Sequence, residues 1–176
     1  MSKPNGWTPS AANDPNLRWE LLPAGGIGRL LDIGPFDVND GLERLRRGDR
    51  CYTVSIDGRL AHYSWVQRSG SHPITEAGVR VAVARGEFFI YHCRTVEWAR
   101  GKGIYPATLV RIVNDYYEEG CSSAWIYTTR ENIASQRGIL RAGFNLVARL
   151  EAVRLGSHYF RVGRADFERF RASTCP

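Results

Sequence analysis

Short runs of β-branched and aromatic residues, separated by glycine-containing turns, predict a sheet for much of this chain. The clearest hairpin is expected over residues 51–66, where two such runs flank Asp57-Gly58, a dipeptide that suits a type I′ turn. A final antiparallel pair is expected over 144–155 and 157–163. The other expected strands are 17–22, 79–84, 87–96 and 123–129, whereas 67–78 and the glycine-rich 25–28 are expected to be loops.

Three segments carry apolar residues at helical spacing, namely 36–48, 105–120 and 132–143. The second ends at Gly120 and the third at Gly143, and glycine commonly terminates a helix. Strands and helices therefore mix along the chain. We predict an α/β or α+β fold in which helices are layered on one sheet.

Length and composition indicate one domain. The chain has 176 residues, of which 43% are hydrophobic, enough for a core. We expect the domain to span 17–176 and residues 1–16 to be a polar, disordered lead-in without the apolar stretch of a secretory signal. No run reaches the length of a membrane span. Four cysteines without CxxC spacing favour a reducing compartment, so we expect a cytoplasmic protein without a zinc site.

The net charge of +6 suits either nucleic acid or a small polyanion. Most arginines are scattered, and dense basic runs occur only at 44–50 and 100–102. A solvated helix end explains the first of these runs. We therefore expect a small anionic ligand and no nucleic acid.

The second basic run has the composition of a phosphate site. Gly101 and Gly103 flank Lys102, follow Arg100 and precede the expected helix 105–120. The first amides of a helix lack intrahelical acceptors, and the helix dipole adds positive charge there. Glycines without Cβ atoms let a phosphate approach the backbone closely. The sequence matches neither GxxxxGK[ST] nor GxGxxG.

The stretch Arg100-Gly101-Lys102-Gly103-Ile104-Tyr105 resembles the acyl-CoA loop of the GCN5-related N-acetyltransferase (GNAT) superfamily. That pattern is Arg/Gln-x-x-Gly-x-Gly/Ala, and only Tyr105 departs from it. A second resemblance lies in Asn132, Ser135 and Gly143-Phe144, which follow an expected strand. Together the two resemblances indicate that roughly residues 50–163 follow the family pattern. The resemblance implies an α/β (α+β) fold with a mixed, mostly antiparallel sheet, a central splayed pair of parallel strands and flanking helices.

The resemblance also implies the binding site of acetyl-CoA, between strands 87–96 and 123–129 that splay apart. The backbone of Cys93, Thr95 and Val96 should meet the pantetheine and the thioester. Asn132 and Ser135 should lie beside the far arm of the cofactor, and no metal is required. The pyrophosphate should lie against Arg100, Gly101, Lys102, Gly103, Ile104 and Tyr105.

The reaction implied is direct transfer of acetyl to a neutral amine, with a backbone N–H stabilising the oxyanion. The candidate bases are Glu76, Tyr91 and His62. Strict alternation along the strand would put Tyr91 on the face of Thr95, and His92 on the other face. The family often has a tyrosine seven residues after its asparagine, which acts as the general acid that protonates the leaving thiolate. This chain has Ile139 at that position, so no general acid is assigned.

The acceptor expected is a small-molecule amine, anionic or sugar-like, with an amino sugar favoured. The alternatives are a protein or peptide N-acetyltransferase and a non-catalytic acyl-CoA or nucleic-acid-binding module. Some relatives dimerise through terminal strands, so a homodimer through 157–163 is a further expectation. Five aromatic residues of the strands form either a wall for a ring-shaped acceptor or ordinary cross-strand packing, namely Tyr52, Tyr63, Trp65, Phe89 and Tyr91.

Overall fold

The computed structural model describes residues 14–155 and 158–161 and has one central sheet. Its strand order is β1-β2-β3-β6-β7. The first four strands pair antiparallel, whereas β6 and β7 are parallel. The bounds are β1 Leu17–Leu21, β2 Arg50–Ile56, β3 Arg59–Gln67, β6 Glu87–Thr95 and β7 Ser123–Ile126. The expected mixed, mostly antiparallel sheet with one parallel pair is confirmed.

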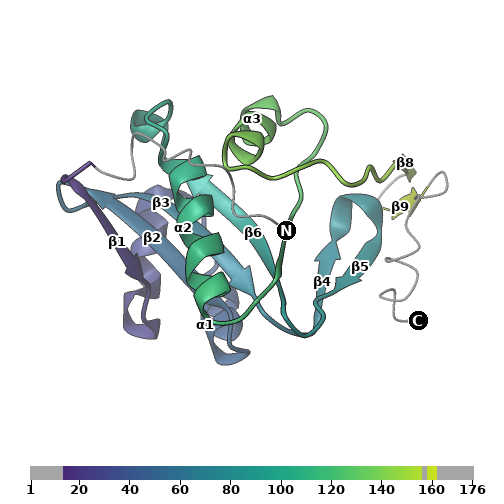
Figure 1. The fold of residues 1–176 in the computed structure, drawn as a ribbon, viewed down its shortest axis with the longest axis horizontal. Helices are drawn as coiled ribbons and strands as arrows, with labels where there is room; N and C mark the ends of the chain where they lie inside the picture. The colour runs from purple at the N-terminus through teal and green to yellow at the C-terminus, as the bar shows by residue number, and fades with distance from the viewer. Residues whose placement is uncertain (1–13, 156–157, 162–176) are drawn as a thin grey trace.

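Helices cover both faces of this sheet (Figure 1). Helix α2 (Ile104–Glu118) lies on one face, and the 3₁₀ helix η2 (Ala24–Ile33) and α1 (Val38–Arg46) lie on the other. Asp37 caps α1, because its carboxylate accepts hydrogen bonds from the first free amides of the helix. The short η4 (Glu97–Ala99) precedes α2, and α3 (Ile133–Arg141) packs against α2.

The core has two halves, one for each face. On the α2 face, Phe88, Ile90 and Tyr52 pack against apolar residues of α2. On the α1 face, Tyr63 and Trp65 are almost fully buried, and Phe89 and Tyr91 extend the same surface. The aromatic residues expected as a possible wall therefore form buried cross-strand packing, and Tyr52 lies on the opposite face from the rest.

Three segments differ from the sequence-based expectation. Residues 67–78 contain strand β4 (Ser71–Ile74) and a 3₁₀ turn, η3 (Thr75–Ala77). Strand β4 pairs with β5 (Val79–Ala82) in a separate hairpin, where the lack of an N–H in Pro73 is tolerated because a two-stranded ribbon has open edges. The glycine-rich 25–28 lies in η2, and three apolar side chains of that helix, Ile27, Leu30 and Ile33, are buried.

The third difference lies near the C-terminus. Only β8 (Ala152–Leu155) and β9 (His158–Arg161) pair there, and 144–151 has no regular secondary structure. The turn expected at 156–157, the segment after 161 and most of the lead-in 1–16 lie outside the described residues. None of the described helices combines the length and apolar composition that a bilayer span needs.

Candidate acetyl-CoA site and acceptor face

The two parallel strands separate after four residue pairs. The last pair is Ile90 with Ile126, where β7 ends, whereas β6 continues to Thr95. On its other edge β6 remains paired with β3, and the Val96 amide donates to the Ala61 carbonyl at 2.9 Å. By antiparallel alternation, the N–H and C=O of Thr95 then point away from β3 toward the open edge. The expected splay is therefore present.

Both backbone groups of Val96 already have partners. Its N–H bonds to Ala61, and its carbonyl accepts the Ala99 amide at 3.1 Å. A role for Val96 toward pantetheine would therefore use the second lone pair of that carbonyl. Thr95 offers its N–H, and its carbonyl, which accepts a hydrogen bond from Arg100 Nε at 3.4 Å, keeps a second lone pair.

A β-bulge lies beside the open edge. Between the pairs Trp65–Tyr91 and Tyr63–Arg94, β3 advances by two residues and β6 by three, and His92 has a φ of 47°. The extra residue moves Tyr91 to the α1 face and leaves Thr95 on the α2 face, where its hydroxyl bonds His62 at 2.7 Å. The expectation that Tyr91 and Thr95 share a face, opposite His92, is wrong.

The loop before α2 leaves backbone donors free. Gly101 and Gly103 have φ values of 76° and 74°, a conformation that favours glycine. Gly103 is the N-cap of α2, and no side chain caps the helix there. The Ala107 amide donates to the Gly103 carbonyl, so the α2 amides before Ala107 have no acceptor within the helix. Nearby, Trp98 is 40% exposed, with the Lys102 ammonium 5.7 Å from its ring centre. The helix end is therefore positive and accessible to an anion.

Tyr105, the departure from the family pattern, packs against α3. Its hydroxyl lies 3.2 Å from Ser135 Oγ, and a Cβ placed on Gly138 would meet its ring at 2.5 Å. Asn132 is the N-cap of α3 and accepts the Ser135 amide at 3.1 Å. Asn132 and Ser135 thus begin the helix that carries Gly138, the residue whose missing side chain makes room for Tyr105.

We expect Gly138→Ala to lower the free energy of unfolding by about 1–3 kcal/mol, because the added methyl group overlaps the Tyr105 ring. The effect runs against helix propensity, which favours alanine over glycine by roughly 0.5–1 kcal/mol. Urea unfolding of Gly138→Ala in the wild-type and Tyr105→Ala backgrounds measures it. The destabilisation should disappear in the second background, and an equal loss in both would contradict this packing.

Several solved structures with a similar arrangement of elements are acetyltransferases. The ribosomal-protein-alanine N-acetyltransferase from Brucella melitensis biovar Abortus 2308 has 17% identity and a TM-score of 0.58, over 80% of this chain and 99% of its own. AAC(6')-Iy, in complex with a bisubstrate analog CoA-S-monomethyl-acetylneamine, has 15% identity and a TM-score of 0.62, over 79% and 97%. The aminoglycoside antibiotic 6'-N-acetyltransferase AAC(6')-Ih from Acinetobacter baumannii has 11% identity and a TM-score of 0.58, over 80% of this chain and 98% of its own.

The fold is that of the GCN5-related N-acetyltransferases. No protein-family model matches the sequence, and no curated protein matches it. In this acetyltransferase fold the open edge of β6 and the first turn of α2 lie where the sequence resemblance put the acyl-CoA site.

The three candidate bases lie in different surroundings. His62 is fully buried on the α2 face, and its two nitrogens bond Thr95 and Ser64 at 2.7 and 2.8 Å. Burial lowers its pKa to about 3. A histidine with both nitrogens engaged and no exposed surface suits a structural role better than proton transfer.

Tyr91 and Glu76 lie on the opposite side of the sheet from His62. The Tyr91 hydroxyl donates to the buried carboxylate of Asp49 and accepts from Arg47 Nη2 at 3.0 Å. Burial, and then Asp49, raise the pKa of Tyr91, so it keeps its proton and is a poor base. Glu76 is exposed and accepts from the Tyr127 hydroxyl at 3.3 Å. Glu76 is therefore the candidate base with solvent access.

Cys93 lies in the bulge, but it does not have the properties of a covalent nucleophile. Burial raises the pKa of its thiol to about 12, so the thiolate is scarce at neutral pH. Cys51, Cys93 and Cys121, the three cysteines in the described part, are all free thiols. No cluster of potential metal ligands occurs among the described residues.

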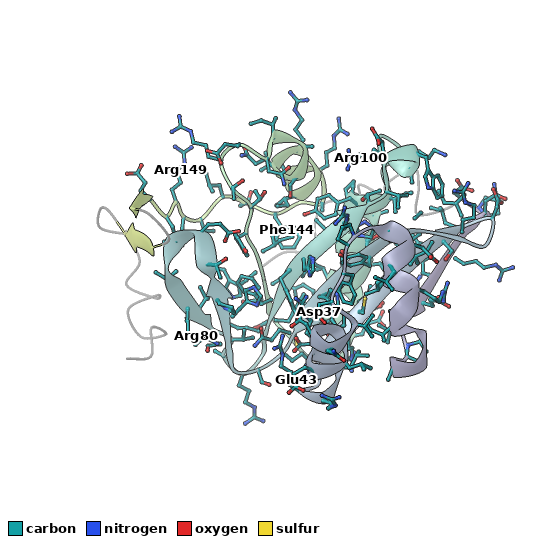
Figure 2. The ribbon with its side chains drawn as sticks, turned by 180° about the vertical axis from the view of Figure 1, so that it is seen from behind. Asp37, Glu43, Arg80, Arg100, Phe144 and Arg149 are labelled. Atoms are coloured by element: carbon teal, nitrogen blue, oxygen red, sulfur yellow. The ribbon has the colours of Figure 1, made fainter. Side chains whose placement is uncertain are left out.

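Residues that the sequence did not single out also gather on the α1 face (Figure 2, viewed from that side, with Asp37 at the start of α1 and Arg80 on β5). Asp49, with a side chain 2% exposed, joins Tyr91 to Arg47. His72 of β4 packs on Phe89 and Tyr91. The sequence does not indicate Asp49, because its contact with Tyr91 spans 42 residues of the chain. It does not indicate His72 either, because His72 lies on a strand that Pro73 made hard to predict.

Proposed function

We propose that the protein is an acetyl-CoA-dependent N-acetyltransferase that transfers acetyl directly to the primary amine of an anionic, sugar-like small molecule. The observation that carries the proposal is the open edge of β6 leading to the uncapped first turn of α2. An extended chain with two amides can form hydrogen bonds along the open edge of β6, and a pyrophosphate can bind at the first turn of α2. Acetyl-CoA has both parts in that order.

The residues proposed to hold the cofactor follow from this path. Thr95 offers its backbone to the pantetheine, with Cys93 in the bulge beside it. Arg100 and Lys102 lie beside the free amides of Gly103 and Ile104, where the pyrophosphate would bind. Asn132 and Ser135 start α3 on the other side of Tyr105, near the far arm.

An anionic acceptor is favoured by the cations on the α1 face. Burial lowers the pKa of His72 there, and the charges of Arg47, Arg44 and Arg80 lower it further. Aminoglycosides, the substrates in the name of the similar AAC(6')-Ih, carry several positive charges, which these arginines would repel. An amino sugar that bears a phosphate or a nucleotide would instead be attracted.

Loss of the Arg100 side chain tests the cofactor site. Arg100→Ala should weaken CoA binding about tenfold, because one charge-assisted contact to phosphate is lost. Binding of pantetheine, which has no phosphate, should stay within about twofold, since the bond that Arg100 makes to the Thr95 carbonyl is long, at 3.4 Å. Isothermal titration measures both, with Arg18→Ala at the far edge of the sheet as the control. Equal losses for the two ligands would remove Arg100 from the phosphate site.

Thiol release from acetyl-CoA tests the reaction itself. The amines to compare are nucleotide-linked amino sugars, glucosamine 6-phosphate, glucosamine, neamine and a peptide with N-terminal alanine. Release with a phosphorylated sugar, above that with glucosamine, is the expected result. Release with the peptide alone would redirect the protein to polypeptide acceptors, and tight acetyl-CoA binding without release on any amine would contradict the proposed reaction.

A further inference from the structure

His72 lies over the point where the two parallel strands separate. Ile90 and Ile126 form the last pair, so Tyr91 and Tyr127 are the first residues beyond it on the two strands. The His72 ring centre is 4.4 Å from that of Tyr91 and 6.2 Å from that of Tyr127. It therefore bridges the mouth of the splay on the α1 face.

The tautomer of His72 is fixed by its neighbour. Gln67 Nε2 donates to the Ser69 carbonyl at 2.7 Å, and only the amide nitrogen can do so. Gln67 Oε1 therefore faces His72 Nδ1, at 3.1 Å, and accepts a hydrogen bond from the N–H at Nδ1. In the neutral ring the lone pair then lies on Nε2.

His72 Nε2 has no hydrogen-bond partner among the described residues, and it is not sealed. The buried side-chain polar atoms without a partner in the described part are Arg44 Nε, Trp65 Nε1 and the Tyr116 hydroxyl. Nε2 is absent from that set, and His72 as a whole is 6% exposed. An oriented acceptor atom without a partner in a mostly buried ring can receive a ligand donor.

We propose, building on the acetyltransferase function above, that His72 Nε2 accepts a hydrogen bond from the acceptor amine and holds it uncharged over the thioester. The amine nitrogen then forms its bond to the thioester carbon. The C–S bond breaks with its electron pair on sulfur, one N–H proton leaves for solvent, and sulfur takes a proton from solvent. His72 itself stays neutral throughout.

The charges around His72 support this role. Burial lowers its pKa to about 4, and Arg47, Arg44 and Arg80 add to the effect, while Glu76 opposes it. The same cations would lower the pKa of an amine bound at Nε2 and so raise its neutral, nucleophilic fraction. Tyr91 and Tyr127, the other titrating neighbours, have pKa values raised by burial and stay uncharged. A strong base is therefore unnecessary for a bound amine.

Two substitutions test the inference. His72→Phe keeps an aromatic ring on Phe89 and Tyr91 but has no acceptor atom, whereas His72→Gln restores a polar acceptor. With acetyl-CoA and the best amine of the panel above, His72→Phe should lower kcat/KM for the amine at least about tenfold, mainly through KM. His72→Gln should recover a substantial part, and Kd for acetyl-CoA should stay within about twofold in both.

Nitrogen-15 NMR of histidine-labelled protein gives a second measurement that needs no amine. At pH 7 the His72 spectrum should show a protonated Nδ1 and an unprotonated Nε2, and the opposite tautomer would overturn the inference. It would also fall if a folded His72→Phe that binds acetyl-CoA transfers acetyl at the wild-type rate. A wild-type protein that acetylates no amine at all would instead overturn the proposed function, which separates the two failures.

Discussion

Gly103→Asp should lower the affinity for CoA at least about tenfold while leaving the fold intact, because it puts a negative charge beside the pyrophosphate. The backbone change is tolerated, since aspartate and asparagine adopt the left-handed conformation more readily than other side chains, and Gly103 has a φ of 74°. Gly103 is the N-cap of α2, but its left-handed backbone differs from the extended conformation in which aspartate caps a helix. The expected loss therefore concerns binding.

Gly103→Asn is the matched control for this change. It has nearly the same size and the same tolerance of the left-handed backbone conformation, without the charge. Titration calorimetry with CoA should place its affinity between those of the wild type and Gly103→Asp, and thermal unfolding should show both variants folded. If the aspartate and asparagine variants bind CoA equally, the pyrophosphate does not lie at this helix end.

The second large effect concerns stability at acid pH. Burial lowers the pKa of His62 to about 3, against about 6.5 for an exposed histidine. Between these values the unfolded chain binds a proton that the folded protein does not. Stability therefore rises with pH through this window and falls as the pH is lowered from 6.5. The slope from this one residue reaches at most about 1.4 kcal/mol per pH unit.

Urea unfolding between pH 7.5 and about 5.5 measures this slope, above the range in which ordinary carboxylates titrate. His62→Gln should flatten it by about one proton, whatever the variant loses in absolute stability. His72, with a pKa lowered to about 4, should contribute a similar slope that remains in His62→Gln. An unchanged slope in His62→Gln would mean that His62 is protonated in the folded protein.

Prediction from the sequence succeeded where the signals are local. The hairpin around Asp57-Gly58, the strand 87–96 and the helix after Gly103 were expected, and the structure has them at β2–β3, β6 and α2. A turn dipeptide and helix-periodic apolar residues act within a few positions. The parallel pair was reached through the family resemblance, and the arrangement of β6 and β7 confirms it.

Prediction was weaker where an element depends on a partner distant in the sequence. Pro73 concealed β4, which is held by its pairing with β5 in a separate hairpin. The bulge at His92 arises from the register between β3 and β6, and no residue type at that position announces it. One inserted residue exchanged the faces of the following side chains, and this separated Tyr91 from Thr95.

The sequence by itself therefore determined the glycine-containing loop that leads into α2, since glycines with positive φ and a helix start are properties of five consecutive residues. It also determined most of the strands and all three α-helices. Only the tertiary structure decided which side chains face the splay. It sealed His62 inside the sheet and set His72 over the splay with its Nδ1 bonded to Gln67. Burial and tautomer depend on neighbours that the fold brings together, and the order of residues along the chain does not contain them.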